Sequence, residues 1–176
     1  MQIFREPFPK LNTRAASVAL GTFDGLHNGH ISVIGAASEE AKRLGGALAV
    51  WCFSSPPKNV FSPGFAPPLM TPDEKAAAIA SLGVDILIMP DPAKALLSMS
   101  ADDFIDSFVR SVSPASVFCG FNFTFGKNAL GTPDVLTERL AARGISVNIM
   151  PPVLTADGVP VSSSLLRKRL EENSAL

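Results

Sequence analysis

The sequence lacks the features that mark membrane-bound and exported proteins. No apolar run reaches about 18 uninterrupted residues, the length that spans a bilayer. The N-terminal segment MQIFREPFPK has no long apolar stretch behind a basic start, which an export signal requires. We therefore expect a cytoplasmic protein that does not bind a membrane.

An excess of charge of one sign is also lacking. The chain has 15 lysine and arginine residues against 16 aspartate and glutamate residues, a formal net charge of −1 and a pI near 6.1. Proteins that bind nucleic acid through its phosphates usually carry a clear positive excess. We therefore expect no nucleic-acid partner, and the sequence does not tell which protein, if any, the chain binds.

Cysteine is scarce, with only Cys52 and Cys119. Each lies near the end of an expected buried strand, where a free thiol behaves as a small hydrophobe. We expect both to be reduced core residues. The 176 residues, 47% of them hydrophobic, suffice for a sizeable core. A single domain over residues 1–176 is the expectation.

Histidine is equally scarce, and both histidines lie in the decapeptide GTFDGLHNGH, residues 21–30. The β-branched and apolar run Ser17–Leu20 precedes the decapeptide, and a helical pattern starts near Asn28. This order predicts a strand, a tight loop and a helix N-terminus. His27 and His30 are three residues apart, which places them on one face of the first helical turn.

The decapeptide favours a phosphate site. Its glycines allow sharp turns and a close approach of a ligand to the main chain. The helix N-terminus offers free N–H groups and the positive end of its dipole, and two imidazoles can donate to the same oxygens. A surface pair of histidines and a metal site are the alternatives. A metal site would need a further strong ligand, and the chain has no other histidine.

Apolar runs and helical spacings alternate along the rest of the chain, behind an extended lead-in with room for a short edge strand. Such alternation predicts an α/β fold with a doubly wound parallel sheet of about five strands and helices on both faces. Further strands are expected at Ala47–Phe53, Asp85–Pro90, Ala115–Gly120 and Ile145–Met150, and further helices at 72–82, 99–112, 132–143 and 165–172.

Two loops follow expected strands at the edge of the sheet where open α/β folds bind ligands. The loop at 54–68 is so rich in proline and glycine that we expect no regular structure in it, and we prefer a substrate loop to a bland connector. The second loop, 120–132, contains three phenylalanines between glycines. It is either a hairpin arm packed on the core or, the interpretation we prefer, a loop that presents Asn122 and an aromatic face to a planar ligand.

A serine cluster, Ser162 to Ser164, opens the last helix, and Arg167 follows one turn later. Serine hydroxyls and free N–H groups at a helix start can hold phosphate oxygens, and an arginine can bridge them. The commoner meaning of such serines is simple helix capping beside a solvated arginine. The presence of the decapeptide at residues 21–30, from here on called the histidine loop, favours the phosphate interpretation.

GTFDGLHNGH resembles the signature GxFDGxHxGH of the HxGH nucleotidyltransferases, whose fold is Rossmann-like. Further stretches resemble one branch, the FMN adenylyltransferase (FAD synthetase) module of bacterial riboflavin kinase/FAD synthetases. That family has FxPHP, GVD, G(x)(D/N)FxFGxxxxG and VSSTxIR in chain order. This chain has FSSPP, LGVD at 82–85, GFNFTFGKNALG at 120–131 and VSSSLLR at 161–167. The resemblance covers nearly the whole chain.

The resemblance implies transfer of AMP from ATP to FMN, giving FAD and pyrophosphate, with Mg²⁺ on the triphosphate and no metal ligand in the protein. It implies that His27 and His30 are catalytic, binding the ATP phosphates and stabilising charge on the α-phosphoryl group. Nucleotide-binding roles are implied for Gly21, Phe23, Asp24, Asn122, Ser162, Ser163, Ser164 and Arg167, and flavin contacts for Phe61 and Phe125.

The chain departs from the family pattern in three places. Pro56 stands where FxPHP has histidine, Ser164 replaces threonine, and no residues are left for a riboflavin kinase domain behind the last helix. Two alternatives stay open, and Pro56 supports the first of them. One is a related nucleotidyltransferase that acts on another phosphorylated acceptor, and the other is a flavin- or nucleotide-binding protein with weakened catalysis.

Overall fold

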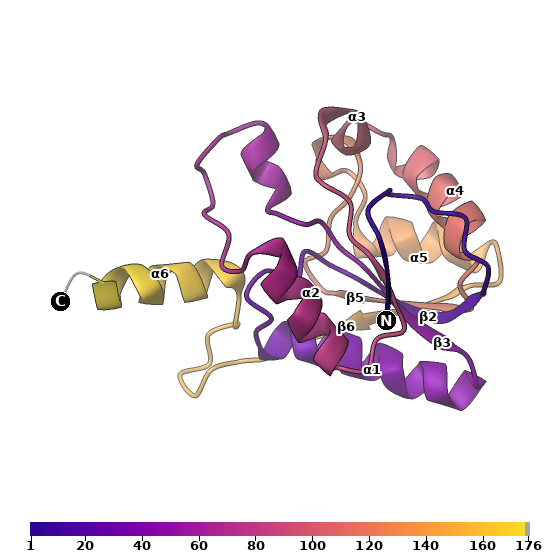
Figure 1. Ribbon diagram of the computed structural model, residues 1–176, viewed down its shortest axis with the longest axis horizontal. Coiled ribbons are helices and arrows are strands. Elements are labelled where there is room, and N and C mark those ends of the chain that lie inside the picture. Colours follow the sequence, from indigo (N-terminus) through magenta and orange to yellow (C-terminus); the bar gives the residue numbers. More distant parts are fainter. Residues whose placement is uncertain (175–176) are drawn as a thin grey trace.

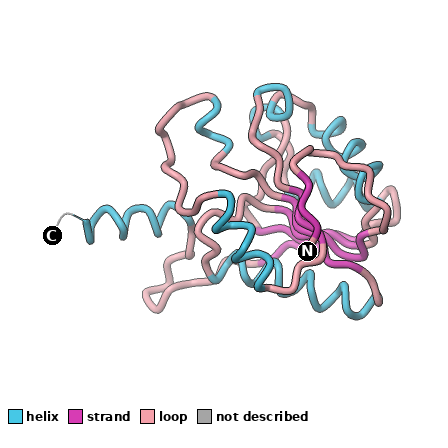
Figure 2. Tube along the Cα trace, viewed as in Figure 1, coloured by secondary structure: helices cyan, strands magenta, loops and turns pink. Residues whose placement is uncertain are grey.

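Six parallel strands form one sheet in the computed structural model, which describes residues 1–174. In chain order the strands are β1 (Gln2–Phe4), β2 (Ala15–Leu20), β3 (Ala47–Trp51), β4 (Ile86–Ile88), β5 (Ser116–Gly120) and β6 (Ser146–Met150). Figure 1 labels all of these strands except β1 and β4, and Figure 2 shows the strands gathered between the helices. Their order across the sheet is β1-β4-β3-β2-β5-β6.

The strand order reverses between β2 and β5. From β2 the chain moves outward to β3 and β4, and it later returns to β5 on the opposite side of β2. Leu20, the last residue of β2, pairs with Trp51 on one side and with Cys119 on the other. Loops that leave neighbouring strands in opposite directions open a crevice at their carboxyl ends, which is where open α/β sheets bind ligands.

Helices cover both faces of the sheet, because successive strand residues point to opposite sides. The helices are α1 (Asn28–Leu44), α2 (Pro72–Ser81), α3 (Lys94–Leu97), α4 (Ala101–Val112), α5 (Pro133–Ala141) and α6 (Ser163–Ser174). Val18 and Leu20 pack in one core cluster with residues of α4 and α5, while Ala19 packs in the other with residues of α1 and α2. In Figure 1 α6 runs away from the body of the domain.

The predicted fold class is confirmed, and so are the five expected strands; the lead-in supplies a sixth, since β1 pairs with β4 at the edge of the sheet. The prediction that residues 54–68 hold no regular structure is wrong for one turn. A 3₁₀ helix, Pro57–Val60, forms there, because proline suits the first position of a helical turn and a 3₁₀ turn needs few residues. The short helix α3 was not predicted either.

Cys52 and Cys119 are buried free thiols, as predicted. Burial raises the pKa of Cys52 to about 12 and that of Cys119 to about 11, so both stay protonated and act as core residues. Across residues 1–174 no helix combines the length and apolar character needed to cross a bilayer.

We expect Phe108→Ala to lower the free energy of unfolding by about 3–5 kcal/mol, because it opens a cavity between α4 and the sheet. The Phe108 side chain is 0% exposed. Urea denaturation followed by the fluorescence of Trp51, the one tryptophan of the sequence, measures the change. The control is Phe121→Ala at an exposed ring, expected to change the value by no more than about 0.5 kcal/mol. Equal losses in the two variants would contradict this assignment of the core.

Candidate functional site

The loop between β2 and α1 has a strained backbone. Phe23 and Leu26 have φ angles of 46° and 36°, in the left-handed region that bulky residues rarely adopt. Phe23 is held there because its ring is buried in the core under Gly21, where a Cβ atom would lie 2.8 Å from that ring. Strain of this kind costs about 1–3 kcal/mol for each residue and gathers at functional sites. The loop is therefore fixed before any ligand arrives.

The two imidazoles form a stack at the start of α1. The ring centroids of His27 and His30 lie 3.7 Å apart with 20° between the ring planes. The Phe23 ring packs on His30 in a T-shaped contact, with the ring centroids 5.3 Å apart and 82° between the ring planes. Gly29 leaves room for the stack, since a Cβ atom there would lie 3.1 Å from Cε1 and Nδ1 of His27. The sequence brought these residues together, and the fold fixes how the rings lie.

Both histidines are neutral in the free protein at physiological pH. Burial lowers the pKa of His27. The pKa of His30 is lowered to about 3, first by burial and then by the positive charges of His27 and Lys75. A protonated stack would place two positive charges side by side in a poorly solvated place, which the free protein avoids. An anion bound beside the rings would reverse part of this cost.

The N-terminus of α1 is left without the side-chain caps that other helices have. Thr71, Ser100 and Thr132 cap α2, α4 and α5, and each of these helices has an acidic residue in its first turn. The cap residue of α1 is His27, whose side chain makes no capping hydrogen bond, and its first turn has no acidic residue. Nδ1 of His27 and Nδ1 of His30 are buried and have no hydrogen-bond partner within residues 1–174. Free N–H groups and unpaired imidazole nitrogens in one place fit an anionic ligand.

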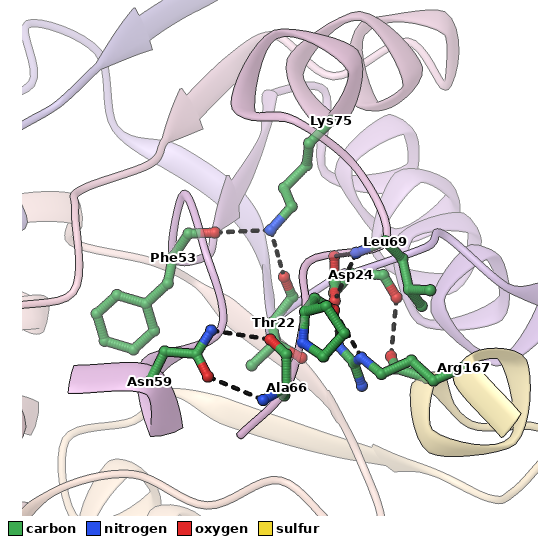
Figure 3. A network of polar contacts seen from close by, with 10 residues as sticks. Thr22, Asp24, Phe53, Asn59, Ala66, Leu69, Lys75 and Arg167 are labelled. Atoms are coloured by element: carbon green, nitrogen blue, oxygen red, sulfur yellow. Dashed lines mark hydrogen bonds and ion pairs between the residues drawn. The ribbon is translucent and has the colours of Figure 1, made fainter. Parts of the chain in front are cut away.

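Asp24 joins the histidine loop to two distant segments (Figure 3). Its carboxylate accepts hydrogen bonds from the backbone N–H of Leu69, at 3.1 and 3.3 Å, and from Nη2 of Arg167. Nε of Arg167 donates to the Pro67 carbonyl at 2.8 Å, and the Ser163 hydroxyl donates to the Asp24 carbonyl at 2.8 Å. The start of α6 is thereby held against the histidine loop, although some 140 residues separate them in sequence.

Of this cluster, Ser163 and Arg167 reach the histidine loop, and both bond to Asp24. The Ser162 hydroxyl accepts from the Leu165 N–H at 3.2 Å, which is ordinary helix capping, and Ser164 is exposed. Asp24 uses its carboxylate on the protein itself. Arg167 likewise spends Nε and Nη2 on Pro67 and Asp24. Their direct contacts with a nucleotide remain predictions.

The proline-rich loop presents an exposed phenylalanine. The Asn59 side chain pairs with the backbone of Ala66, donating to its carbonyl at 2.8 Å and accepting from its N–H at 2.9 Å. This closes the loop, and Phe61, 60% exposed, lies on it. Pro56 directly precedes the 3₁₀ turn. The loop is preformed, with an aromatic surface available to a planar ligand.

Phe125 lies elsewhere than our preferred interpretation placed it. Phe125 and Gly131 form an antiparallel bridge, so residues 125–131 fold back as a hairpin arm, the alternative that the sequence left open. The Phe125 ring is 8% exposed and packs on Phe104 and Phe123. Phe61 is far more exposed than Phe125 and is the stronger of the two candidates, and a flavin contact of Phe125 stays a prediction. Asn122, just past β5, is exposed.

Lys75 is a residue that sequence reasoning missed. It lies on the buried side of α2 beside Ala76 and Ile79, and its ammonium group donates to the Thr22 carbonyl in the histidine loop and to the Phe53 carbonyl after β3. The signal was available: a lysine occupies an apolar position of a helix with a capping box. No group of three or more histidine, cysteine or acidic residues that could hold a metal occurs in the described part of the chain.

The chain is similar to proteins of flavin metabolism. The profile of a family described as FAD synthetase matches residues 10–165. A bifunctional riboflavin kinase/FMN adenylyltransferase of Bacillus subtilis (strain 168) is 33% identical over 156 residues, covering 88% of this chain and 49% of the relative. A putative protein of the same description from Geobacillus thermodenitrificans is 32% identical, covering 88% of this chain and 82% of the relative. The chain spans about half the length of the first of these.

Solved structures agree with the fold. A structure described as a macrolide-efflux protein from Streptococcus pneumoniae has a TM-score of 0.83 at 24% identity, covering 96% of this chain and 55% of that one. Pantothenate synthetase from Thermus thermophilus has a TM-score of 0.61 at 18% identity, covering 94% of this chain and 67% of that one. At such identities these structures establish the architecture alone.

We expect Gly29→Ala to displace the His27 ring, because the added methyl group would lie 3.1 Å from that ring. The matched control is Gly35→Ala on the same helix, where nothing lies within 4 Å of the new Cβ atom. The control should raise the stability by about 1 kcal/mol through helix propensity alone. NMR signals of the two imidazoles, with thermal denaturation, measure both effects. Imidazole signals that stay at their wild-type positions in Gly29→Ala would contradict the stacked geometry.

We expect the free energy of unfolding to fall as the pH is lowered from 7.5 to about 5.5, above the range in which carboxylates titrate. The pKa of His30 is about 3 in the folded protein and about 6.5 when unfolded, so the unfolded state takes up a proton first. Urea denaturation across this range measures the slope. His30→Phe should flatten it, and His27→Gln should flatten it less. An unchanged slope in His30→Phe would contradict the burial of that imidazole.

Proposed function

Since the chain belongs to the FAD synthetase family, we propose that it transfers the AMP portion of ATP to FMN, with release of pyrophosphate. One observation carries the proposal. The Ser163 and Arg167 side chains are bonded to Asp24 in the loop that holds the stacked histidines. The two motifs that the resemblance assigns to ATP therefore lie together at the switch point of the sheet.

In this proposal the triphosphate lies at the N-terminus of α1, where free N–H groups attract anions. His27 and His30 donate hydrogen bonds to its oxygens, and the negative charge of the phosphates raises the pKa of both rings toward their ordinary range. Magnesium enters with ATP, bound mainly through phosphate oxygens, as is usual for this ion.

The reaction needs positioning and charge stabilisation. An oxygen of the FMN phosphate attacks the α-phosphorus of ATP, a new P–O bond forms, and the bond to the bridging oxygen of the leaving pyrophosphate breaks. The N–H groups of α1 and the imidazoles stabilise charge that develops on the α-phosphoryl oxygens. No covalent enzyme intermediate is required. Phe61 offers a ring face to the isoalloxazine system. The cytoplasm is the compartment that these substrates imply.

We expect the purified protein to form FAD and pyrophosphate in equal amounts from ATP, Mg²⁺ and FMN. His30→Ala should lower kcat by about 10²-fold or more, because it removes a preorganised donor at the reacting phosphate. Ile31→Ala, an exposed neighbour on the same helix, is the matched control and should keep wild-type activity. Coupled pyrophosphate release and chromatography of FAD measure both products.

The same assay is run with a panel of acceptors. The panel contains FMN, riboflavin, which has no phosphate group, and phosphorylated compounds other than FMN. Pyrophosphate release with another acceptor, and none with FMN, would establish the related nucleotidyltransferase instead. Saturable binding of FMN or ATP without any pyrophosphate release would establish a binding protein. FAD formation that survives His30→Ala would refute the role given to the imidazole.

A further inference from the structure

Lys75 is a charged side chain in a place that charged side chains seldom occupy. The residue is 1% exposed, among the most buried side chains of the described chain. Taking an ammonium group out of water is costly unless it is paired or hydrogen-bonded, and burial accordingly lowers the pKa of Lys75. An apolar residue of similar length would fill the same space without this cost. The charge therefore needs an explanation beyond packing.

The ammonium group of Lys75 joins the ends of two neighbouring strands (Figure 3). Its Nζ donates to the Phe53 carbonyl at 2.9 Å and to the Thr22 carbonyl at 3.1 Å. Thr22 lies two residues beyond the end of β2, and Phe53 lies two residues beyond the end of β3. At this point the two strands have stopped pairing, and their loops are about to part. Lys75 replaces the missing ladder with two hydrogen bonds from a third element.

One of the two loops carries the histidines. Thr22 directly precedes Phe23, whose strained backbone and buried ring set the edge contact to His30. A shift of the Thr22 carbonyl would move Phe23 and with it the imidazole stack. The charge of Lys75 also acts on His30 directly, as one of the causes that lower its pKa, and the negative charge of Asp24 favours the protonated form of Lys75.

The other loop leads to the exposed phenylalanine. From Phe53 the chain passes to Ser54, whose N–H donates to the Pro90 carbonyl at 3.0 Å and whose hydroxyl donates to Asp91. It then continues through the 3₁₀ turn to Phe61. Lys75 is thus the point at which the loop assigned to the triphosphate and the loop assigned to the acceptor are held in register.

We propose that Lys75 is a positioning residue, which aligns the histidine loop with the loop after β3 so that the two substrates meet in the reactive geometry. The proposal rests on the function proposed above, because it takes these loops to hold ATP and FMN. Misalignment of about 1 Å can cost about 10²-fold in rate without loss of binding. Loss of a residue that only stabilises the fold lowers the amount of folded protein. It does not lower kcat of the molecules that remain folded.

The test compares Lys75→Met with Ile79→Ala. Methionine keeps most of the length and removes the donors, whereas Ile79 is a buried residue on the same helix whose apolar side chain has no donor for the loop carbonyls. Both variants are assayed well below their melting temperatures. We expect Lys75→Met to lower kcat by about tenfold or more, with KM for ATP and for FMN within about threefold of wild type. Ile79→Ala should keep kcat within about twofold.

NMR of the imidazoles gives a readout that does not depend on turnover. With only two histidines in the sequence, the signals are few. In the unliganded protein they should shift in Lys75→Met and stay in place in Ile79→Ala. If the wild type makes no FAD, the function proposed above fails, and Lys75 is then judged on these signals alone. Unchanged imidazole signals in Lys75→Met, or unchanged kcat in a folded variant, would overturn the positioning role.

Thr71→Ala is the second variant, for the case in which Lys75→Met does not fold. Thr71 is exposed, and its hydroxyl accepts from the Glu74 N–H at 3.2 Å in the capping box that fixes the first turn of α2. Loss of this cap loosens the turn that carries Lys75. We expect kcat to fall about twofold to fivefold with KM unchanged, and the imidazole signals to shift in the same direction. Wild-type kcat and signals in Thr71→Ala would count against the proposal.

Discussion

The buried carboxylate of Asp24 is the point on which the site depends. The ion pair between Asp24 and Arg167 joins side chains that are 4% and 16% exposed, and the same carboxylate accepts two contacts from the backbone of Leu69. Removing one partner of a buried ion pair costs about 3–5 kcal/mol, because the other charge is left uncompensated. Three segments that are far apart in sequence are therefore fixed to one another by a single charge.

Around this charge the site combines a rigid backbone with polar groups that have no hydrogen-bond partner. Phe23, Gly21 and Lys75 fix the backbone behind the histidines, whereas Nδ1 of each imidazole has no partner within residues 1–174 and the start of α1 has no side-chain cap. Polar groups of this kind are costly in a free protein and favourable once a complementary ligand arrives. These groups are already in place in the free protein, so an anion that binds gains their hydrogen bonds without a rearrangement of the loop.

Much of this arrangement follows from local sequence. The apolar run that stops at Gly21, the capping box at Thr71 and the glycine pair after Leu44 each act over a few residues, and each predicted its element. The alternation of strands and helices predicted that the histidine loop follows the end of a parallel strand, whereas the strand order that makes this place a switch point was not predicted. The fold class and the motif positions were therefore predictable from short-range chemistry.

What escaped prediction depends on contacts between distant residues. Phe125 looked available to a ligand, but its depth is decided by packing against Phe104, some twenty residues earlier. Lys75 stands at an apolar position of its helix, which marks it as unusual, but only the approach of two strand ends gives it a role. Arg167 looked free to hold a phosphate, but a buried carboxylate 143 residues away holds it. That separation also sets an order of events during synthesis: at about 5–20 residues per second, the ribosome adds Arg167 roughly 7–30 s after Asp24. Until then the nascent carboxylate has no counter-ion from α6, so the histidine loop and α6 can be joined only after Arg167 has been made.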